Sequence, residues 1–173
     1  MPKLKKIGYA ILKLAHLLFT SLWIGGAFCL ILLLTLGLGG DATHPVVVAI
    51  QIVDLAVVVP AAAGSLLTGI LFSSVTHWGY FKHRWIMAKY LINLIPILLG
   101  AFIQAPWLEH MLALARAYNL PGGLPAEFFH YRDWFLAFTV GQWALLLVAV
   151  YLSIFKPTLR ARSAPPVRQA PAV

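Results

Sequence analysis

Four long runs of apolar residues determine what this chain can fold into. Their approximate bounds are residues 14–38, 46–72, 85–107 and 134–155. A helix needs about 20 apolar residues to cross roughly 30 Å of hydrocarbon. Each run is therefore long enough to cross a bilayer as one helix. Only 10% of the residues are charged, compared with about 25% in a soluble domain. The sequence predicts an all-α fold, an integral membrane four-helix bundle.

The segments outside the four runs are short. The basic stretch before the first run resembles the start of a signal peptide, but the apolar run is longer than the roughly 7–15 residues of such a peptide and no A-x-A-like cleavage site follows it, so we expect a retained helix. Residues 1–157 then form the bundle domain. The proline-rich composition of the tail 158–173 predicts that it is disordered. The loop 108–133 is long enough for a short surface helix, "WLEHMLALARAY".

Basic side chains gather at one predicted end of the bundle. They precede the first run, separate the second from the third, and follow the fourth, whereas four of the five acidic residues lie in the other two loops. Cytoplasmic loops carry the excess of Lys and Arg, so both termini are expected in the cytoplasm of a bacterial-type inner membrane. Because the net charge of +8 arises from these flanks, it predicts the lipid bilayer as a partner and no nucleic acid.

Polar and small residues recur at helical spacing within each run. Residues three, four, seven and eleven apart share one face of a helix, so these faces are expected to meet inside the bundle. Small residues let helix backbones approach, and Ser, Thr, Asn and Gln bond across helices. The four faces comprise Lys13, His16, Thr20, Trp23 and Ala27; Gln51, Asp54, Ala61, Ser65 and Thr68; Lys89, Asn93, Pro96 and Gly100; and Gln142 with Phe135, Phe138 and Ala149.

Three of these residues are ionisable, which is costly inside a membrane and marks them as candidate functional residues. His16 and Lys89 each lie about one turn inside the predicted cytoplasmic boundary, and Thr68 of the descending second helix reaches the same depth. Asp54 enters from the other side, about 12 Å below the outer surface. The sequence thus predicts two separate polar sites, with Asp54 as a protonated carboxyl, a proton entry point or a structural hydrogen-bonding group.

His16 is the residue with the most specific chemistry. A histidine in a dry bundle, near Trp23 and small residues that leave space, suits axial ligation of haem iron. From spacing alone, two other roles remain open for His16. In one, a neighbouring helix satisfies the hydrogen-bonding groups of the ring; in the other, the ring is part of a proton relay.

Three motifs resemble a known family. "KLAHLLFTSLWIGGAF" is similar to the first helix of HemJ-type protoporphyrinogen oxidases and related CopD-like membrane proteins, with His16, Trp23 and Gly26 in a His-x6-Trp-x-x-Gly pattern. "VVPAAAGSLLTGILF" resembles their second helix. "RWIMAKYLINLI" resembles the start of their third helix, where Trp85 and Lys89 form Trp-x-x-x-Lys. The three matches follow the family's order and topology.

The resemblance implies a cofactor and roles for two residues. His16 would bind the iron of haem b, and Lys89 would act at the same site, either as a neutral ligand or as a charged partner of a haem propionate. The implied function is redox, as electron transfer or oxidation of a porphyrinogen-like or quinone substrate. However, the pattern expects an arginine and a Tyr-His pair where this chain has "CLILLLTLG", and a further histidine where it has "ILLGAFIQA". Their loss weakens the implied porphyrinogen oxidation.

Several expectations complete the sequence-based hypothesis. The alternative function is a small transporter, copper-handling protein or assembly factor in which Asp54 and Lys89 serve as a relay. An interfacial role is favoured for His83, with a second axial ligand or, together with Arg84, a propionate partner as the alternatives. A redox partner and a homo-oligomer are compatible with either function. At the outer face, three histidines raise the question of a copper or zinc site. These are His44, His110 and His130.

Overall fold

The structure, a computed structural model, describes residues 6–39, 42–75, 84–117 and 124–155. Within these ranges the secondary structure is helical and contains no strand. Four helical segments are long and apolar enough to cross a membrane. The protein is therefore a multi-pass membrane protein with a four-helix bundle, as the sequence predicts.

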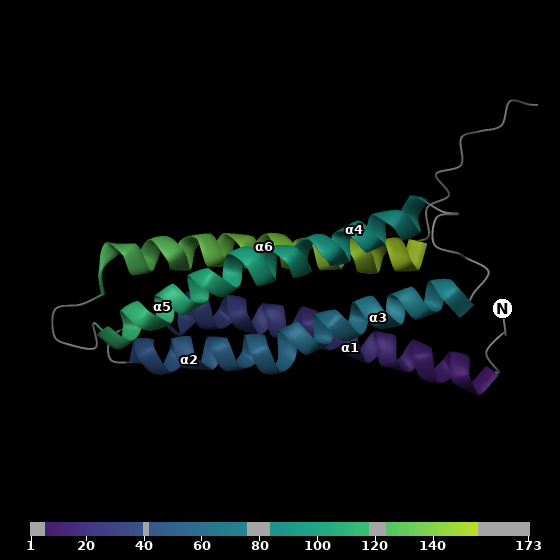
Figure 1. The fold of residues 1–173 in the computed structure, drawn as a ribbon, viewed down its shortest axis with the longest axis horizontal. Helices are drawn as coiled ribbons and strands as arrows, with labels where there is room; N and C mark the ends of the chain where they lie inside the picture. Colours follow the sequence, from purple (N-terminus) through teal and green to yellow (C-terminus); the bar gives the residue numbers. More distant parts are fainter. Residues whose placement is uncertain (1–5, 40–41, 76–83, 118–123, 156–173) are drawn as a thin grey trace, which may run out of the picture.

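Two of the four spans are single helices and two are interrupted by a π-helical turn. The elements are α1 (Lys6–Leu36); α2 (Thr43–Val53), η2 (Asp54–Val58) and α3 (Val59–Val75); α4 (Arg84–Leu99), η3 (Gly100–Gln104) and α5 (Ala105–Ala117); and α6 (Ala126–Phe155). In Figure 1 the start of α1, the end of α3, the start of α4 and the end of α6 lie at the same end of the bundle. Successive spans are thus antiparallel.

The third and fourth spans are longer than predicted, and the prediction of a separate surface helix in a long outer loop is wrong. The segment 107–117 continues the third span as α5, and α6 begins at Ala126 rather than near residue 134. The physical reason is burial. Leu108, Met111 and Leu112 of α5 are buried in a cluster with residues of the other three spans, so this segment completes the core instead of lying on the membrane surface.

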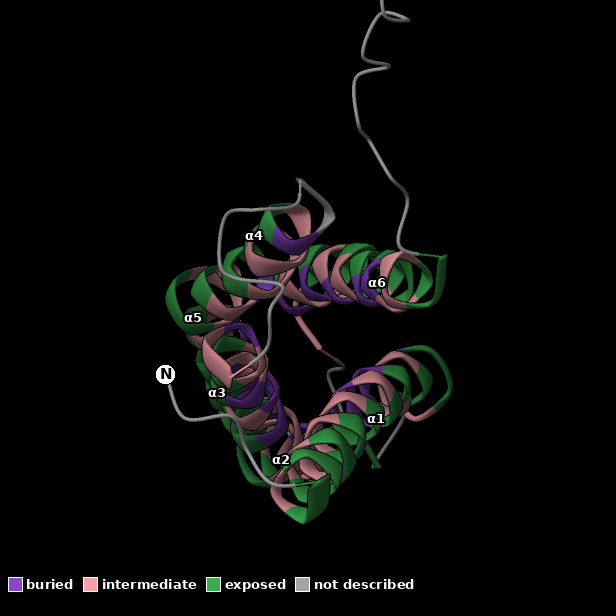
Figure 2. Ribbon diagram, turned by 90° about the vertical axis from the view of Figure 1, so that its right-hand side faces the viewer, coloured by how far each residue is buried: buried purple, intermediate pink, exposed green. Residues whose placement is uncertain are grey.

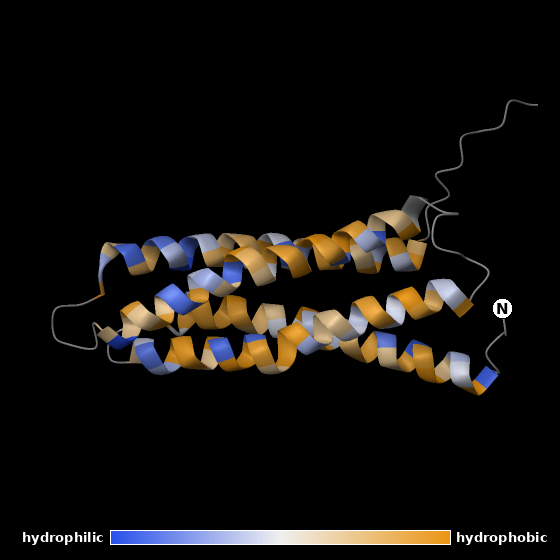
Figure 3. Ribbon diagram, in the orientation of Figure 1, coloured by the Kyte–Doolittle hydropathy of each residue, from blue (hydrophilic) through white to orange (hydrophobic). Residues whose placement is uncertain are grey.

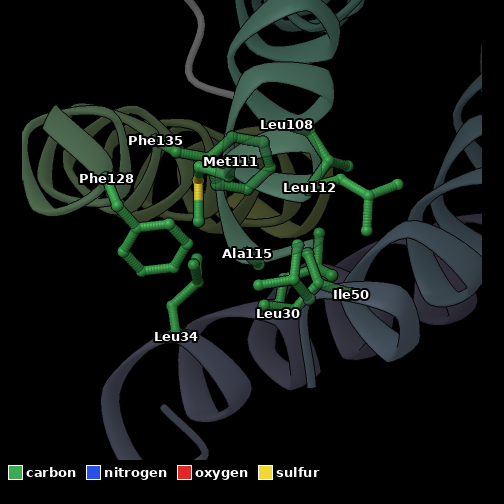
Figure 4. Close-up of a cluster of buried hydrophobic side chains, with 10 residues drawn as sticks. Leu30, Leu34, Ile50, Leu108, Met111, Leu112, Ala115, Phe128 and Phe135 are labelled. Carbon is green, nitrogen blue, oxygen red and sulfur yellow. The ribbon is translucent and has the colours of Figure 1, made fainter. Parts of the chain in front are cut away.

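That cluster forms the core of the half of the bundle that holds α2 and α5. Figure 4 shows side chains from all four spans converging there, with Phe128 and Phe135 beside Met111. Viewed along the bundle, buried residues face inward and exposed ones outward (Figure 2). Many exposed side chains are large and apolar, and Figure 3 shows apolar residues along most of α1 to α3. This outer surface suits contact with lipid tails rather than water.

In the other half of the bundle, α1 and α3 approach closely at a glycine. A Cβ atom at Gly64 would lie 2.5 Å from Cδ1 of the Phe19 ring, so only glycine fits without displacement. Near the same level, the Thr20 and Ser65 hydroxyls are 3.2 Å apart and share a hydrogen bond. Small and hydroxyl-bearing residues therefore join these two helices, as the sequence predicts. Asn93 differs from the prediction, because its amide donates to Lys89 O of its own helix at 2.7 Å.

Both π-helical turns occur next to a proline. Pro60 follows η2 as the second residue of α3, and Pro106 follows η3 as the second residue of α5. Proline lacks an N–H donor and its ring crowds the preceding turn of a helix. In η2 the Val59 N–H bonds to Asp54 O, and in η3 the Ala105 N–H bonds to Gly100 O. Each wide turn carries one polar residue into the bundle, Asp54 in η2 and Gln104 in η3.

Candidate functional site

His16 and Thr68 join α1 to α3. The His16 Nδ1 atom lies 2.8 Å from Thr68 Oγ1. The Thr68 hydroxyl also lies 2.6 Å from Gly64 O and 3.1 Å from Ser65 O, and it donates to these backbone carbonyls. The sequence predicted both residues at one depth, and the structure brings them into direct contact.

The contact between His16 Nδ1 and Thr68 Oγ1 can be satisfied in two ways. A hydroxyl has a single proton to donate. When the Thr68 proton is directed to a backbone carbonyl, Thr68 Oγ1 accepts a hydrogen bond from Nδ1–H. The lone pair of the neutral ring then resides on Nε2. When the hydroxyl instead donates to Nδ1, the proton of the neutral ring is on Nε2.

The His16 ring packs against α3. Phe72 lies edge-on against it, with ring centroids 5.6 Å apart. Gly69 also lies next to the ring, since a Cβ atom there would be 3.6 Å from His16 Cε1, an ordinary van der Waals contact. Thr20 donates to His16 O at 2.8 Å. Packing and hydrogen bonds thus orient the ring.

Lys89 of α4 belongs to the same region. Its charge is close enough to act on the His16 ring. The adjacent Tyr90 donates a hydrogen bond to Ser73, which ties α4 to α3 at this level. Among the described residues, no carboxylate pairs with Lys89. The half-buried ammonium is therefore a cationic group next to a ring that can act as a ligand.

Trp23 and Asp54 line a different feature, a cavity of about 330 Å³ between the four spans. Trp23 is buried, at 2% exposure. Neither His16 nor Lys89 lines this cavity. The sequence-based separation of the Asp54 region from the His16 region agrees with this arrangement. Trp23, however, faces the Asp54 cavity and not the His16 site, because it lies about two helical turns from His16.

The sequence analysis did not single out Gln104 or Thr139, which also line the cavity. Gln104 Nε2 donates to Thr139 Oγ1 at 3.0 Å, and Thr139 in turn donates to Phe135 O at 2.7 Å. Gln142 Nε2 donates to Gln104 Oε1. The isolated glutamine in the apolar stretch "AFIQAPW" was the available signal, because it lies four residues after Gly100 and eleven after Asn93, on the face predicted to point inward.

The outer histidines do not assemble into a metal site within the described residues, which contain no group of three or more His, Cys, Asp or Glu side chains able to hold a metal. His110 stacks on Tyr131 with centroids 5.1 Å apart, and His130 packs against Tyr131 and Trp134. The His44 Nε2 atom is buried and has no hydrogen-bond partner among the residues that the structure describes. His83 lies outside the described residues, as does the Arg84 side chain.

Comparisons with protein-family models, curated proteins and solved structures found no match for this chain.

Proposed function

We propose that this protein is a membrane haem b protein in which His16 Nε2 is an axial ligand of the iron. The observation that carries the proposal is the 2.8 Å contact between His16 Nδ1 and Thr68 Oγ1. With Nδ1–H donating to this hydroxyl, the Nε2 lone pair would be free to bind iron. Histidines that bind metals characteristically donate their other ring N–H to a neighbouring oxygen, which fixes the ring and raises its basicity. Thr68 and Ser65 supply these acceptors.

The remaining groups near His16 fit a haem as well. Phe72 adds an apolar contact, and a charged Lys89 would pair with a propionate. A neutral Lys89 would instead be a second ligand. When bound, haem supplies one-electron chemistry, whereas the protein contributes binding, orientation and electrostatics. We accordingly propose a redox function, as electron transfer or oxidation of a quinone or porphyrinogen-like substrate.

A relay through both Asp54 and Lys89, the alternative proposed from the sequence, has less support. Only Asp54 lines the cavity, whereas the charge of Lys89 acts on the His16 ring. The two groups therefore belong to different sites. A transporter would have to connect them through a path that the hydrogen bonds of the described residues do not form.

The hydrogen bond from His16 to Thr68 provides the first test of the haem proposal. We expect Thr68→Val to lower haem affinity by about tenfold, because loss of a second-shell partner typically lowers metal affinity by about 10–100-fold and the Ser65 backbone remains as an acceptor. Haemin titration of haem-free protein, followed by the Soret band, measures the affinity.

Thr68→Ser is the matched variant for this test, since it keeps the hydroxyl and should bind haem like the parent. Thr35→Val is a second control. The Thr35 hydroxyl bonds only within α1, at 2.7 Å to Ile31 O. Equal haem affinity in Thr68→Val and the parent would refute the role assigned to Thr68.

We also propose that the end of the bundle holding the start of α1 and the end of α6 faces the cytoplasm. The basic side chains flank this end, and the positive-inside rule assigns such flanks to the cytoplasmic side. Tags at the two termini should be inaccessible to an impermeant label in intact cells and become accessible after permeabilisation. Labelling of either tag from outside intact cells would reverse the orientation.

A further inference from the structure

The cavity lined by Trp23 and Asp54 is a second candidate binding site, independent of haem at His16. Its volume of about 330 Å³ lies at the lower end of the roughly 300–1,000 Å³ typical of small-molecule pockets. Most of its lining is apolar, with Trp23 and Phe135 as its aromatic side chains. This combination of an apolar wall and a few polar groups is typical of a pocket that binds a small organic molecule.

The polar groups of the cavity offer acceptors rather than positive charge. Among the described residues, Asp54 has no hydrogen-bond or ion-pair partner, and none of those lining the cavity is basic. The chain of hydrogen bonds from Thr139 through Gln104 orients Gln142 so that its Nε2 is used. No hydrogen bond to its Oε1 is formed within the described residues. A ligand that donates hydrogen bonds and carries positive charge would satisfy both groups.

The cavity opens laterally, between the second and third spans. Leu55 and Val59 line it and are nevertheless 61% and 51% exposed, and the lining residue Ala101 of η3 is also exposed. These residues lie on neighbouring spans whose outer surface contacts lipid. A ligand can therefore reach Asp54 from the hydrocarbon layer, which favours a molecule with an apolar portion.

We infer that this cavity binds a small lipophilic organic ammonium ion, with the ammonium at Asp54 and the apolar portion against Trp23 and Phe135. A carboxylate forms its strongest hydrogen bonds with charged donors, and aromatic faces attract cations. A bare metal ion is disfavoured, since Ca²⁺ and Mg²⁺ take about six or more oxygen ligands and this cavity offers few. An anion would be repelled by Asp54.

Two ligands that differ in charge test the inference. Phenethylamine is protonated at neutral pH, whereas 2-phenylethanol has the same ring and chain with a neutral hydroxyl. We expect the full-length protein in non-ionic detergent to bind phenethylamine saturably, and at least about tenfold more tightly than the alcohol, because hydrogen bonds to charged groups are the stronger ones. Isothermal titration calorimetry measures both affinities.

Variants of the cavity residues test whether phenethylamine binds at Asp54. Asp54→Asn should lower the affinity for phenethylamine about tenfold and leave that for the alcohol unchanged, whereas Ala62→Leu, which fills the cavity from a buried position, should weaken both. Glu127→Gln removes an exposed carboxylate elsewhere and is the matched control for lost charge.

Three results would overturn the inference. One is equal binding of the amine and the alcohol, which would indicate a site for neutral aromatic molecules such as hydroquinones. Another is unchanged amine affinity in Asp54→Asn. If Asp54→Asn does not fold, unchanged amine affinity in Ala62→Leu is decisive instead. None of these results bears on haem binding, which His16→Ala tests separately.

Discussion

We expect the His16→Ala protein to purify as a folded membrane protein that has lost stoichiometric haem. The substitution removes the imidazole ring whose Nδ1 contacts Thr68 Oγ1 and whose Nε2 is the proposed ligand of the iron. Alanine cannot ligate iron, so the coordinate bond is lost entirely rather than weakened. Haem content per chain, measured by pyridine haemochrome, should fall from about one to near zero while the elution volume stays that of the parent.

Two comparisons make this result specific. His130→Ala removes an exposed outer histidine and should leave haem content unchanged. Lys89→Ala should retain haem, with lower affinity if Lys89 pairs with a propionate or with a shifted Soret band if neutral Lys89 is a ligand. A folded His16→Ala protein with the haem content and Soret position of the parent would refute ligation by His16.

The second large effect should come from Gly64→Val. A Cβ atom at this position would lie 2.5 to 2.6 Å from three carbon atoms of the Phe19 ring, and valine adds two further methyl groups. Overpacking of this kind costs about 1–3 kcal/mol, so we expect α1 and α3 to separate and the thermal midpoint in detergent to fall. The separation should also weaken the contact between His16 and Thr68.

Gly25→Val is the matched control, because nothing lies within 4 Å of a Cβ atom at Gly25. This glycine of α1 is exposed, and its substitution should change the thermal midpoint little. Similar midpoints for Gly64→Val and Gly25→Val would show that the close approach of α1 and α3 does not limit stability.

Much of the bundle follows from local sequence patterns. The number of spans depends on the length of apolar runs, and the inward faces depend on helical spacing, so both could be predicted. The same spacing placed His16 with Thr68 and separated them from Asp54. These features require only the geometry of a regular helix and the cost of exposing polar groups to lipid.

The features that could not be predicted depend on irregular backbone or on tertiary packing. The two π-helical turns interrupt the regular phase of their spans, and local spacing does not predict where such a turn occurs. The continuation of the third span into α5 depends on burial of Met111 against other spans, which could not be predicted because the adjacent Glu109 and His110 are polar. The contact between His16 Nδ1 and Thr68 Oγ1 depends on the relative position of α1 and α3.

The absorption spectrum of the purified full-length protein, from cells supplied with haem, tests the central claim most directly. A Soret band and about one haem b per chain, lost in His16→Ala, are the result expected from an Nε2 ligand fixed by Thr68. A folded, monodisperse protein that shows no Soret band and does not bind added haemin saturably would contradict the assignment of this protein as a haem protein.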